Sequence, residues 1–203
     1  LRLNGNNLTE YRDASGSPLG RLYDLDVLGN EIFVCGRNGI FRFNGSGFTA
    51  VPLPEPLRGI SVYSCHLDAS GGVWLCTLGK GAWHLTLEGE VLAFWDEEKG
   101  FPSNTVYDMT AGEGTRWFGT TRGIVGLDLT TSRLLLPPSD NLLRRAAVPS
   151  LDMTDEGLLW VGSLEGLILY DPMSSKNLRQ FTDRNGILGT DVASSNGVTA
   201  GLN

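Results

Sequence analysis

The sequence predicts an all-β fold, a β-propeller of four-stranded antiparallel blades, and three observations lead to this prediction. A large aromatic residue recurs at intervals of 41, 43 and 43 residues, at Phe33, Trp74, Trp117 and Trp160. A glycine that precedes an apolar residue keeps nearly the same period, at Gly39, Gly81, Gly123 and Gly166. Between these landmarks apolar residues alternate with polar ones, which is typical of strands and not of the helix pairs of a solenoid. A period of roughly 40 to 50 residues with one aromatic residue per unit is what propeller blades show.

The second unit displays the expected strands most clearly. Alternating or β-rich stretches at 62–67, 73–77, 82–87 and 91–95 predict four strands. Three short segments rich in Asp, Ser, Gly and Lys separate them, and these residue types favour tight turns because Asp bonds its own turn and Gly accepts positive φ. Four antiparallel strands in about 42 residues make one blade.

The same plan divides the whole chain into one continuous array. We expect full blades at about 21–61, 62–104, 105–147 and 148–190, a half-blade at 1–20 and another at 191–203. If the two halves pair, the array closes into about five blades and leaves no exposed sheet edge. If they do not, the chain is a section of a larger propeller. Its first residue, a leucine, favours a start that lies upstream or was removed with a signal segment.

The recurring aromatic residues are predicted to be structural. A large ring on the second strand of a blade would pack between neighbouring blades, where each blade buries a face that a lone sheet would leave wet. We therefore expect Phe33, Trp74, Trp117 and Trp160 to belong to the core and not to a ligand platform.

Composition excludes several classes of function. The chain has 203 residues, a net charge of −7 and no basic stripe, so nucleic acid is not expected as a partner. No apolar run is long enough to span a membrane. Three cysteines without a C-x-x-C pair predict neither a disulfide framework nor a zinc site. Cys35 and Cys76 stand where other units have glycine, and we interpret them as small buried residues, with a redox or ligand role as the alternative.

The connections between blades contain a recurring sequence pattern. Residues 95–106 read WDEEKGFPSNTV, residues 117–124 read WFGTTRGI, and residues 181–192 repeat the first pattern as FTDRNGILGTDV. This wording is similar to the two-component regulator propeller repeat, and the similarity recurs in register over nearly the whole chain. The resemblance implies a sensor domain of a membrane-bound histidine kinase or diguanylate cyclase, in the periplasm or outside the cell. It also implies a ligand such as an oligosaccharide, or a protein partner, and a parent that usually has seven blades and is membrane-anchored, with a dimer as one option.

A ligand site is expected where the second-to-third loops and the inter-blade loops share a face around the central channel, because ligands bind at concave places lined by several loops. The polar and charged residues of these loops are Arg37, Asn38, Lys80, Ser103, Asn104, Arg122, Glu165, Thr190 and Asp191. The alternative interpretation is that Ser103, Asn104 and Asp191 only cap backbone groups where a strand begins.

Signals for catalysis are weak. His66 and His84 lie on expected strands and neither has a partner at the spacing of a metal site or a triad, so we expect structural histidines. The acids at 96–98 lie together in one loop, and Arg144 with Arg145 is expected in a short, solvated helical turn. No phosphate-binding loop, cofactor or metal is predicted. The chain is therefore predicted to be a sensor without enzyme activity; an interaction scaffold, or a lyase or glycosidase built on a propeller, is the alternative.

Overall fold

The computed structural model describes residues 2–4, 7–13 and 15–185. The chain packs as two compact units, one made of residues 1–75 and 83–93 and the other of residues 76–82 and 94–203. None of the helices in the described ranges has the length and apolar character needed to cross a bilayer.

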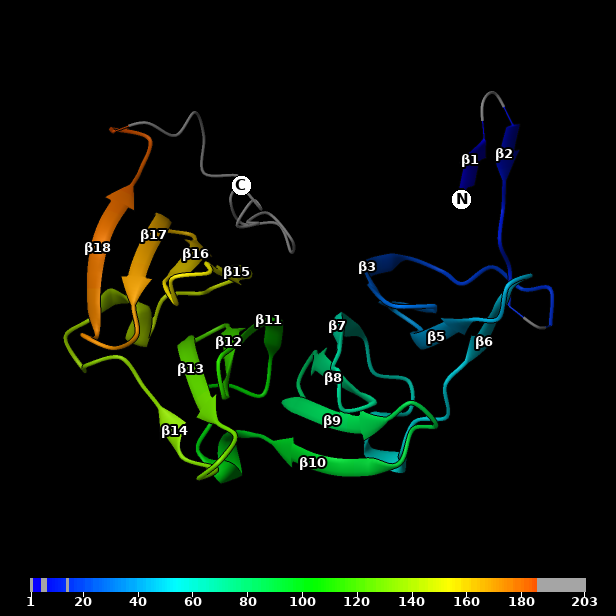
Figure 1. Ribbon diagram of the computed structural model, residues 1–203, viewed down its shortest axis with the longest axis horizontal. Helices are drawn as coiled ribbons and strands as arrows, with labels where there is room; N and C mark the ends of the chain where they lie inside the picture. The colour runs from blue at the N-terminus through cyan, green and yellow to red at the C-terminus, as the bar shows by residue number, and fades with distance from the viewer. Residues whose placement is uncertain (1, 5–6, 14, 186–203) are drawn as a thin grey trace. The chain divides into compact units, whose positions relative to one another are not determined.

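Four four-stranded antiparallel sheets follow one another along the chain (Figure 1). Sheet 1 contains β3 (Leu22–Leu28), β4 (Glu31–Gly36), β5 (Gly39–Phe43) and β6 (Phe48–Ala50). Sheet 2 contains β7 (Val62–Leu67), β8 (Gly72–Thr77), β9 (Ala82–Thr86) and β10 (Val91–Trp95). Sheet 3 contains β11 (Val106–Gly112), β12 (Thr115–Thr120), β13 (Gly123–Asp128) and β14 (Leu134–Leu135). Sheet 4 contains β15 (Ser150–Met153), β16 (Leu159–Ser163), β17 (Gly166–Asp171) and β18 (Lys176–Phe181).

The strands of each sheet are hydrogen-bonded in chain order, so the predicted all-β plan of four-stranded meanders is confirmed. In sheet 2 the strands agree with the predicted ranges to within one residue at each end. Within the described residues, three short 3-10 helices lie outside the sheets: η1 (Glu55–Leu57), η2 (Glu97–Lys99) and η3 (Leu142–Arg144).

The two chain ends differ in what can be described. β1 (Arg2–Asn4) pairs antiparallel with β2 (Asn7–Thr9), as expected for the last two strands of a half-blade. The half-blade expected at 191–203 lies outside the described residues.

The repeated glycine marks a turn that no other residue fits without strain. Gly39, Gly81, Gly123 and Gly166 have φ angles of +100°, +75°, +96° and +109°, a region that L side chains rarely adopt. At Gly123 an added Cβ would also lie 2.6 Å from the carbonyl oxygen of Leu143 in η3. The glycine N–H donates to the carbonyl oxygen of Ala146 at 2.8 Å. This position therefore lets the segment after the sheet pack directly on the turn between its second and third strands.

A hydroxyl at the end of the second strand completes the same turn. The Oγ1 atoms of Thr77 and Thr120 donate to the carbonyl oxygens of Gly81 and Gly123, both at 2.7 Å. Ser163 does the same to Gly166 at 2.9 Å. The Thr or Ser of the repeat thus adds a side-chain hydrogen bond to a carbonyl of the tight turn; the Gly81 carbonyl also accepts the backbone N–H of Thr77 at 3.2 Å.

We expect Thr120→Val to lower the free energy of unfolding by about 1 to 3 kcal/mol, because valine keeps the shape but removes the hydroxyl that donates to the Gly123 carbonyl and accepts the N–H of Arg122. Urea unfolding followed by circular dichroism measures the change. Thr130→Val, at an exposed residue of the turn after β13, is the control and should change stability by less than about 0.5 kcal/mol. Equal losses in the two variants would contradict the role of the hydroxyl.

Carboxylates on the first strand of one sheet bind the first strand of the next. Asp24 accepts the N–H of Leu25 at 2.7 Å and the N–H of Cys65, on β7, at 3.0 Å. In the other unit Asp108 accepts the N–H of Met109 at 2.9 Å and the N–H of Leu151, on β15, at 3.1 Å. Both aspartates follow a β-bulge in their strand. Each carboxylate therefore joins its own strand to the unpaired edge of the neighbouring one.

A second link lies two residues further along each of these strands. Asp26 accepts the N–H of Leu67 at 2.6 Å, and Thr110 Oγ1 accepts the N–H of Met153 at 3.2 Å. Because side chains two residues apart share a strand face, the two links on each strand point to the same neighbour.

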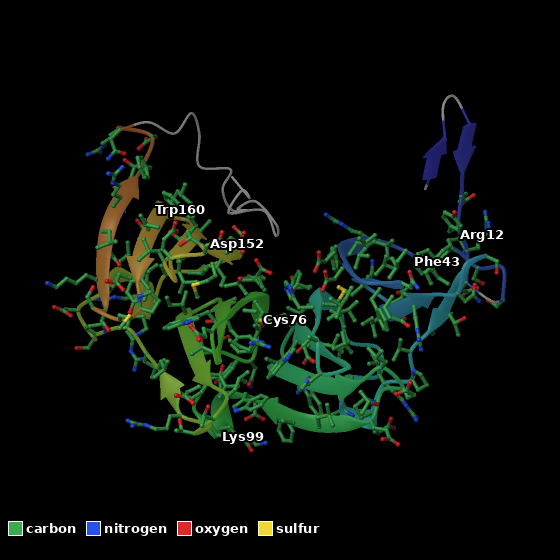
Figure 2. The ribbon with its side chains drawn as sticks, in the orientation of Figure 1. Arg12, Phe43, Cys76, Lys99, Asp152 and Trp160 are labelled. Atoms are coloured by element: carbon green, nitrogen blue, oxygen red, sulfur yellow. The ribbon has the colours of Figure 1, made fainter. Side chains whose placement is uncertain are left out.

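The recurring aromatic residues do not all have the same surroundings. Trp117 is buried, at 3% exposure, in a cluster with residues of sheet 4, and its ring meets that of Tyr170 edge-on at 6.1 Å. Phe33 and Trp74 are also buried. Trp160, labelled in Figure 2, is only partly buried and contacts Phe181 of its own sheet at 6.1 Å. Its partial exposure differs from the expectation for the repeat.

Candidate functional site

Hydrogen bonds of Asp96, Glu97 and Asn104 stabilise the loop between sheets 2 and 3, and we call this set of hydrogen bonds the bracket. Asp96 caps η2 by accepting the N–H of Lys99 at 3.0 Å. The side-chain oxygen of Asn104 accepts the N–H of Glu97 at 2.8 Å, and Glu97 Oε1 accepts the N–H of Asn104 at 3.0 Å. The side chain of each residue thus accepts the backbone N–H of the other, and these two hydrogen bonds connect the two ends of the loop.

Arg122, from the turn between β12 and β13, joins this bracket. Its guanidinium forms a hydrogen-bonded ion pair with Glu97 Oε1. The backbone N–H of Asn104 and the Arg122 guanidinium lower the pKa of Glu97 below its ordinary value. The carboxylate is therefore ionised at neutral pH, and the side chain of Arg122 is held at the rim of the loop.

Beneath this bracket lies a basic cavity of about 520 Å³. Its lining residues are Gly100, Phe101, Pro102, Arg122, Leu136, Arg144 and Arg145. Phe101 anchors the loop because its ring is buried and packs against Phe118 at 5.2 Å. The volume falls within the range of about 300 to 1,000 Å³ that is usual for small-molecule sites.

The two further arginines reach the cavity through η3. Asn141 caps η3 by accepting the N–H of Leu143 at 2.9 Å, and Leu143 is buried. Among the described residues, neither the Arg144 nor the Arg145 guanidinium has an ion-pair partner. Three guanidinium groups with one carboxylate between them favour an anionic ligand, because arginine forms paired hydrogen bonds with carboxylate, sulfate and phosphate oxygens.

The residues predicted for the ligand face have different fates. Asn104 and Arg122 come together through Glu97, as described above. Ser103 is buried, and its Oγ accepts the N–H of Thr105 at 3.1 Å and contacts Thr121 Oγ1 at 2.6 Å. For Ser103 and Asn104 the structure therefore displays the backbone-capping contacts of the alternative interpretation.

Of the remaining predicted residues, those that the structure describes are not among the residues that line the basic cavity. Arg37 is exposed, and Asn38 Nδ2 donates to the carbonyl oxygen of Leu19 at 3.3 Å; both belong to the first unit. Lys80 and Glu165 are exposed on their turns in the second unit. Thr190 and Asp191 lie outside the described residues.

Sequence reasoning placed Glu97 among solvated acids and the Arg144–Arg145 pair in a solvated turn. The expected helical turn is present as η3, but both arginines line the cavity. The sequence did contain a signal for placing these arginines near Arg122. They lie in an inter-blade connection, and such connections were expected to share a face with the turn that carries Arg122.

The structure also pairs His84 with an acid, which its sequence spacing did not predict. His84 Nε2 lies 2.7 Å from Asp68 Oδ2, and the imidazole stacks on Trp74 with centroids 4.3 Å apart. Asp68 further accepts the indole N–H of Trp74 at 3.1 Å, the N–H of Ser70 at 2.8 Å and the Ser70 hydroxyl. Burial raises the pKa of Asp68, but these bonds and the His84 charge outweigh burial and lower it below its ordinary value.

The hydrogen bond between Asp68 and His84 has a structural role. An ionised carboxylate only accepts hydrogen bonds, so Nε2–H of His84 donates to it. Side-chain exposure is 17% for His84 and 10% for Asp68, and the stacked indole covers one face of the imidazole ring. Asp68 is thereby fixed by its hydrogen bonds to the hairpin between β7 and β8, and His84 is fixed by its hydrogen bond to Asp68.

Comparison with known proteins places the fold. No family model matches the chain, and no curated protein matches it. Among solved structures, the extracellular domain of the hybrid two-component system BT3049 from B. thetaiotaomicron matches with a TM-score of 0.67 and 18% identity, over 88% of this chain and 25% of that one. That of the hybrid two-component system BT4673 from the same organism matches with a TM-score of 0.64 and 18% identity, over 77% of this chain and 21% of that one. The WD40 β-propeller domain of Doa1 matches with a TM-score of 0.65 and 11% identity, over 82% of this chain and 55% of that one.

The chain has the β-propeller fold. The four sheets are its blades, and we number blades 1 to 4 as the sheets. The chain spans only about a fifth to a quarter of the two-component-system structures that it resembles. Those two structures are extracellular domains of two-component systems, and at 18% identity the similarity to them concerns the fold.

Proposed function

We propose that this β-propeller is part of an extracytoplasmic sensor domain of a membrane-bound signalling regulator, and that its basic cavity binds a small anionic ligand such as an acidic oligosaccharide. The regulator class rests on the similarity of the repeat and on structural neighbours described as extracellular domains of two-component systems. Because these neighbours are regulator domains, they also favour a chain without enzyme activity of its own.

The observation that carries the ligand class is the convergence of three arginines on one cavity in an acidic chain. The protein has a net charge of −7, yet Arg122, Arg144 and Arg145 line one volume of about 520 Å³. Three positive charges that are balanced by a single carboxylate, that of Glu97, are unfavourable in the free protein, and an anion that binds there relieves the remaining repulsion.

Glu97 has a defined part in this proposal. Its carboxylate neutralises Arg122 when the cavity is free and would repel an incoming anion. Binding therefore exchanges one partner of Arg122 for another, and the loop from Glu97 to Asn104 is the segment that responds. Such an exchange gives a ligand the differential contacts that a conformational signal needs.

Arg144→Ala combined with Arg145→Ala should abolish the rise in melting temperature that acidic oligosaccharides, uronate-containing or sulfated, give the wild-type chain. Neutral oligosaccharides of equal length provide the reference. The measurement is a thermal shift at low ionic strength, repeated at high salt, where screening should weaken the effect. An unchanged shift in the double variant would sink the assignment of this cavity.

Glu97→Gln tests the same proposal in the opposite direction, because this variant should bind acidic oligosaccharides more tightly. Glutamine keeps an oxygen that can accept the N–H of Asn104, but it removes the charge that competes for Arg122. We expect acidic oligosaccharides to bind several-fold more tightly to this variant, measured by calorimetry. Weaker binding would show that Glu97 contacts the ligand directly and would contradict the exchange.

A further inference from the structure

A second cluster of chemically active side chains lies in the first unit, remote in sequence from the basic cavity's lining. Asp24, Cys35 and Cys65 each offer a ligand atom, and these carboxylate and sulfur atoms all lie within 4.8 Å of one another. Cys35 and Cys65 are fully buried, Asp24 is half-buried, and no disulfide joins the cysteines.

Three strands fix this cluster. Asp24 on β3 and Cys35 on β4 are directly opposite each other in the antiparallel register, so their side chains project from the same face of blade 1. Cys65 enters from β7, the first strand of blade 2, and its backbone N–H donates to Asp24 Oδ2 at 3.0 Å. The hydrogen bond that joins the two blades thus brings the second thiol to the first.

The other unit contains the same arrangement without sulfur. Asp108 on β11 lies opposite Gly119 on β12 and accepts the N–H of Leu151 on β15. Here a Cβ at Gly119 would lie 2.5 Å from the carbonyl oxygen of Val148 and 2.7 Å from Leu151 Cδ2, so Val148 and Leu151 fill the space above the glycine. The carboxylate is explained in both places by the link between strands. The two thiols occur in only one of them, and that link does not require them.

We propose that Asp24, Cys35 and Cys65 form a binding site for a thiophilic d10 cation, Zn²⁺ in the first place. Thiolates select such cations, and a carboxylate is a common additional ligand. Tetrahedral Zn²⁺ with Zn–S bonds of about 2.3 Å holds two sulfurs about 3.8 Å apart, a separation that small side-chain rotations reach from the present spacing.

Binding of the cation needs no oxidant, reductant or other reagent. The cation replaces the two thiol protons, which leave to solvent, and Asp24 contributes a carboxylate oxygen. Three protein ligands leave one tetrahedral position for water. The bound ion would join blade 1 to blade 2 at the same point as the Asp24 hydrogen bond. Sequence spacing gave no hint of this site, because Cys35 and Cys65 are thirty residues apart and lack the local pairing of zinc motifs.

Titration of the chain with Co²⁺, in the presence of a reductant that is not a thiol, tests the site directly. We expect a stoichiometric thiolate-to-cobalt charge-transfer band in the near ultraviolet, visible bands of tetrahedral cobalt, and loss of both when Zn²⁺ is added. Cys35→Gly combined with Cys65→Leu copies the pair found between blades 3 and 4, and it should fold but give no charge-transfer band.

Two single variants keep the test decisive if that double variant does not fold. Cys76→Ala removes the third buried cysteine and should leave the band unchanged, whereas Cys65→Ala should reduce its intensity and lower the cobalt affinity by more than tenfold. Absence of the band in the wild-type chain would overturn the proposal. So would a band of undiminished intensity in Cys65→Ala, or a Cys35–Cys65 disulfide in the isolated protein with no metal uptake after reduction.

Discussion

Gly123→Ala is expected to destabilise the protein by about 3 kcal/mol or more. The new Cβ would enter a backbone with φ of +96° and lie 2.6 Å from the backbone of Leu143 and Arg144. The left-handed conformation alone costs an L residue about 1 to 2 kcal/mol. The clash adds to this because the opposing atoms are backbone and cannot rotate away. Urea unfolding of the variant and wild-type chains measures the difference.

Gly114→Ala separates the two contributions. Gly114 also has positive φ, +64°, but no atom lies within 4 Å of the place where a Cβ would be. We expect only the conformational cost, about 1 to 2 kcal/mol. If the two variants lose equal stability, the close approach of η3 to the turn is not what the repeat glycine serves. The Gly123 variant should also impair the basic cavity, since η3 carries Arg144.

Asp68→Ala is the second change with a large expected effect, about 2 to 4 kcal/mol of unfolding free energy. Hydrogen bonds to a charged group contribute about 1.5 to 3 kcal/mol each, though not additively. The variant would leave the buried indole N–H of Trp74 and the ring of His84 without their acceptor. Thermal and urea unfolding measure the loss, and tryptophan fluorescence reports the change around Trp74.

The same acid makes stability depend on pH in a defined direction. Because the folded-state pKa of Asp68 is lowered, its contribution is fully present above the unfolded-state pKa of about 4 and is lost as pH falls through the folded-state value. The stability difference between wild type and Asp68→Asn should therefore shrink below about pH 4. A difference that stays constant down to pH 2 would refute the lowered pKa. Asp155→Ala, at an exposed acid in the matching turn of blade 4, is the control and should change stability by less than about 0.5 kcal/mol.

The fold could be predicted because its signals are local. The strand Val62–Leu67 and its turn follow from alternation and from an Asp–Gly turn, both readable within a few residues. The repeat glycine was recognised by its period alone, and the structure supplies the cause in a positive φ and a close approach. Trp160 departs from the pattern because burial depends on what lies beside a strand, which a period does not specify.

The candidate site could be predicted only in part, because its contacts are not local. Arg122 was proposed from its loop, but its partner Glu97 lies 25 residues earlier in the chain. Arg144 looked like a solvated residue, since nothing in its own turn reveals that the turn packs on Gly123. The Asp68–His84 pair spans two hairpins of one blade, and it was missed because the two residues match no catalytic spacing.

The carboxylate links between first strands give the array a double period. Asp24 and Asp26 in blade 1 and Asp108 with Thr110 in blade 3 supply the acceptors, whereas blades 2 and 4 have Cys65 with Leu67 and Leu151 with Met153 at these positions. Neighbouring blades are therefore not interchangeable modules. An engineer who shortens or extends this propeller should cut and splice it in pairs, since deletion of blade 3 alone would make blades 2 and 4 neighbours, and neither has a carboxylate or hydroxyl at these positions.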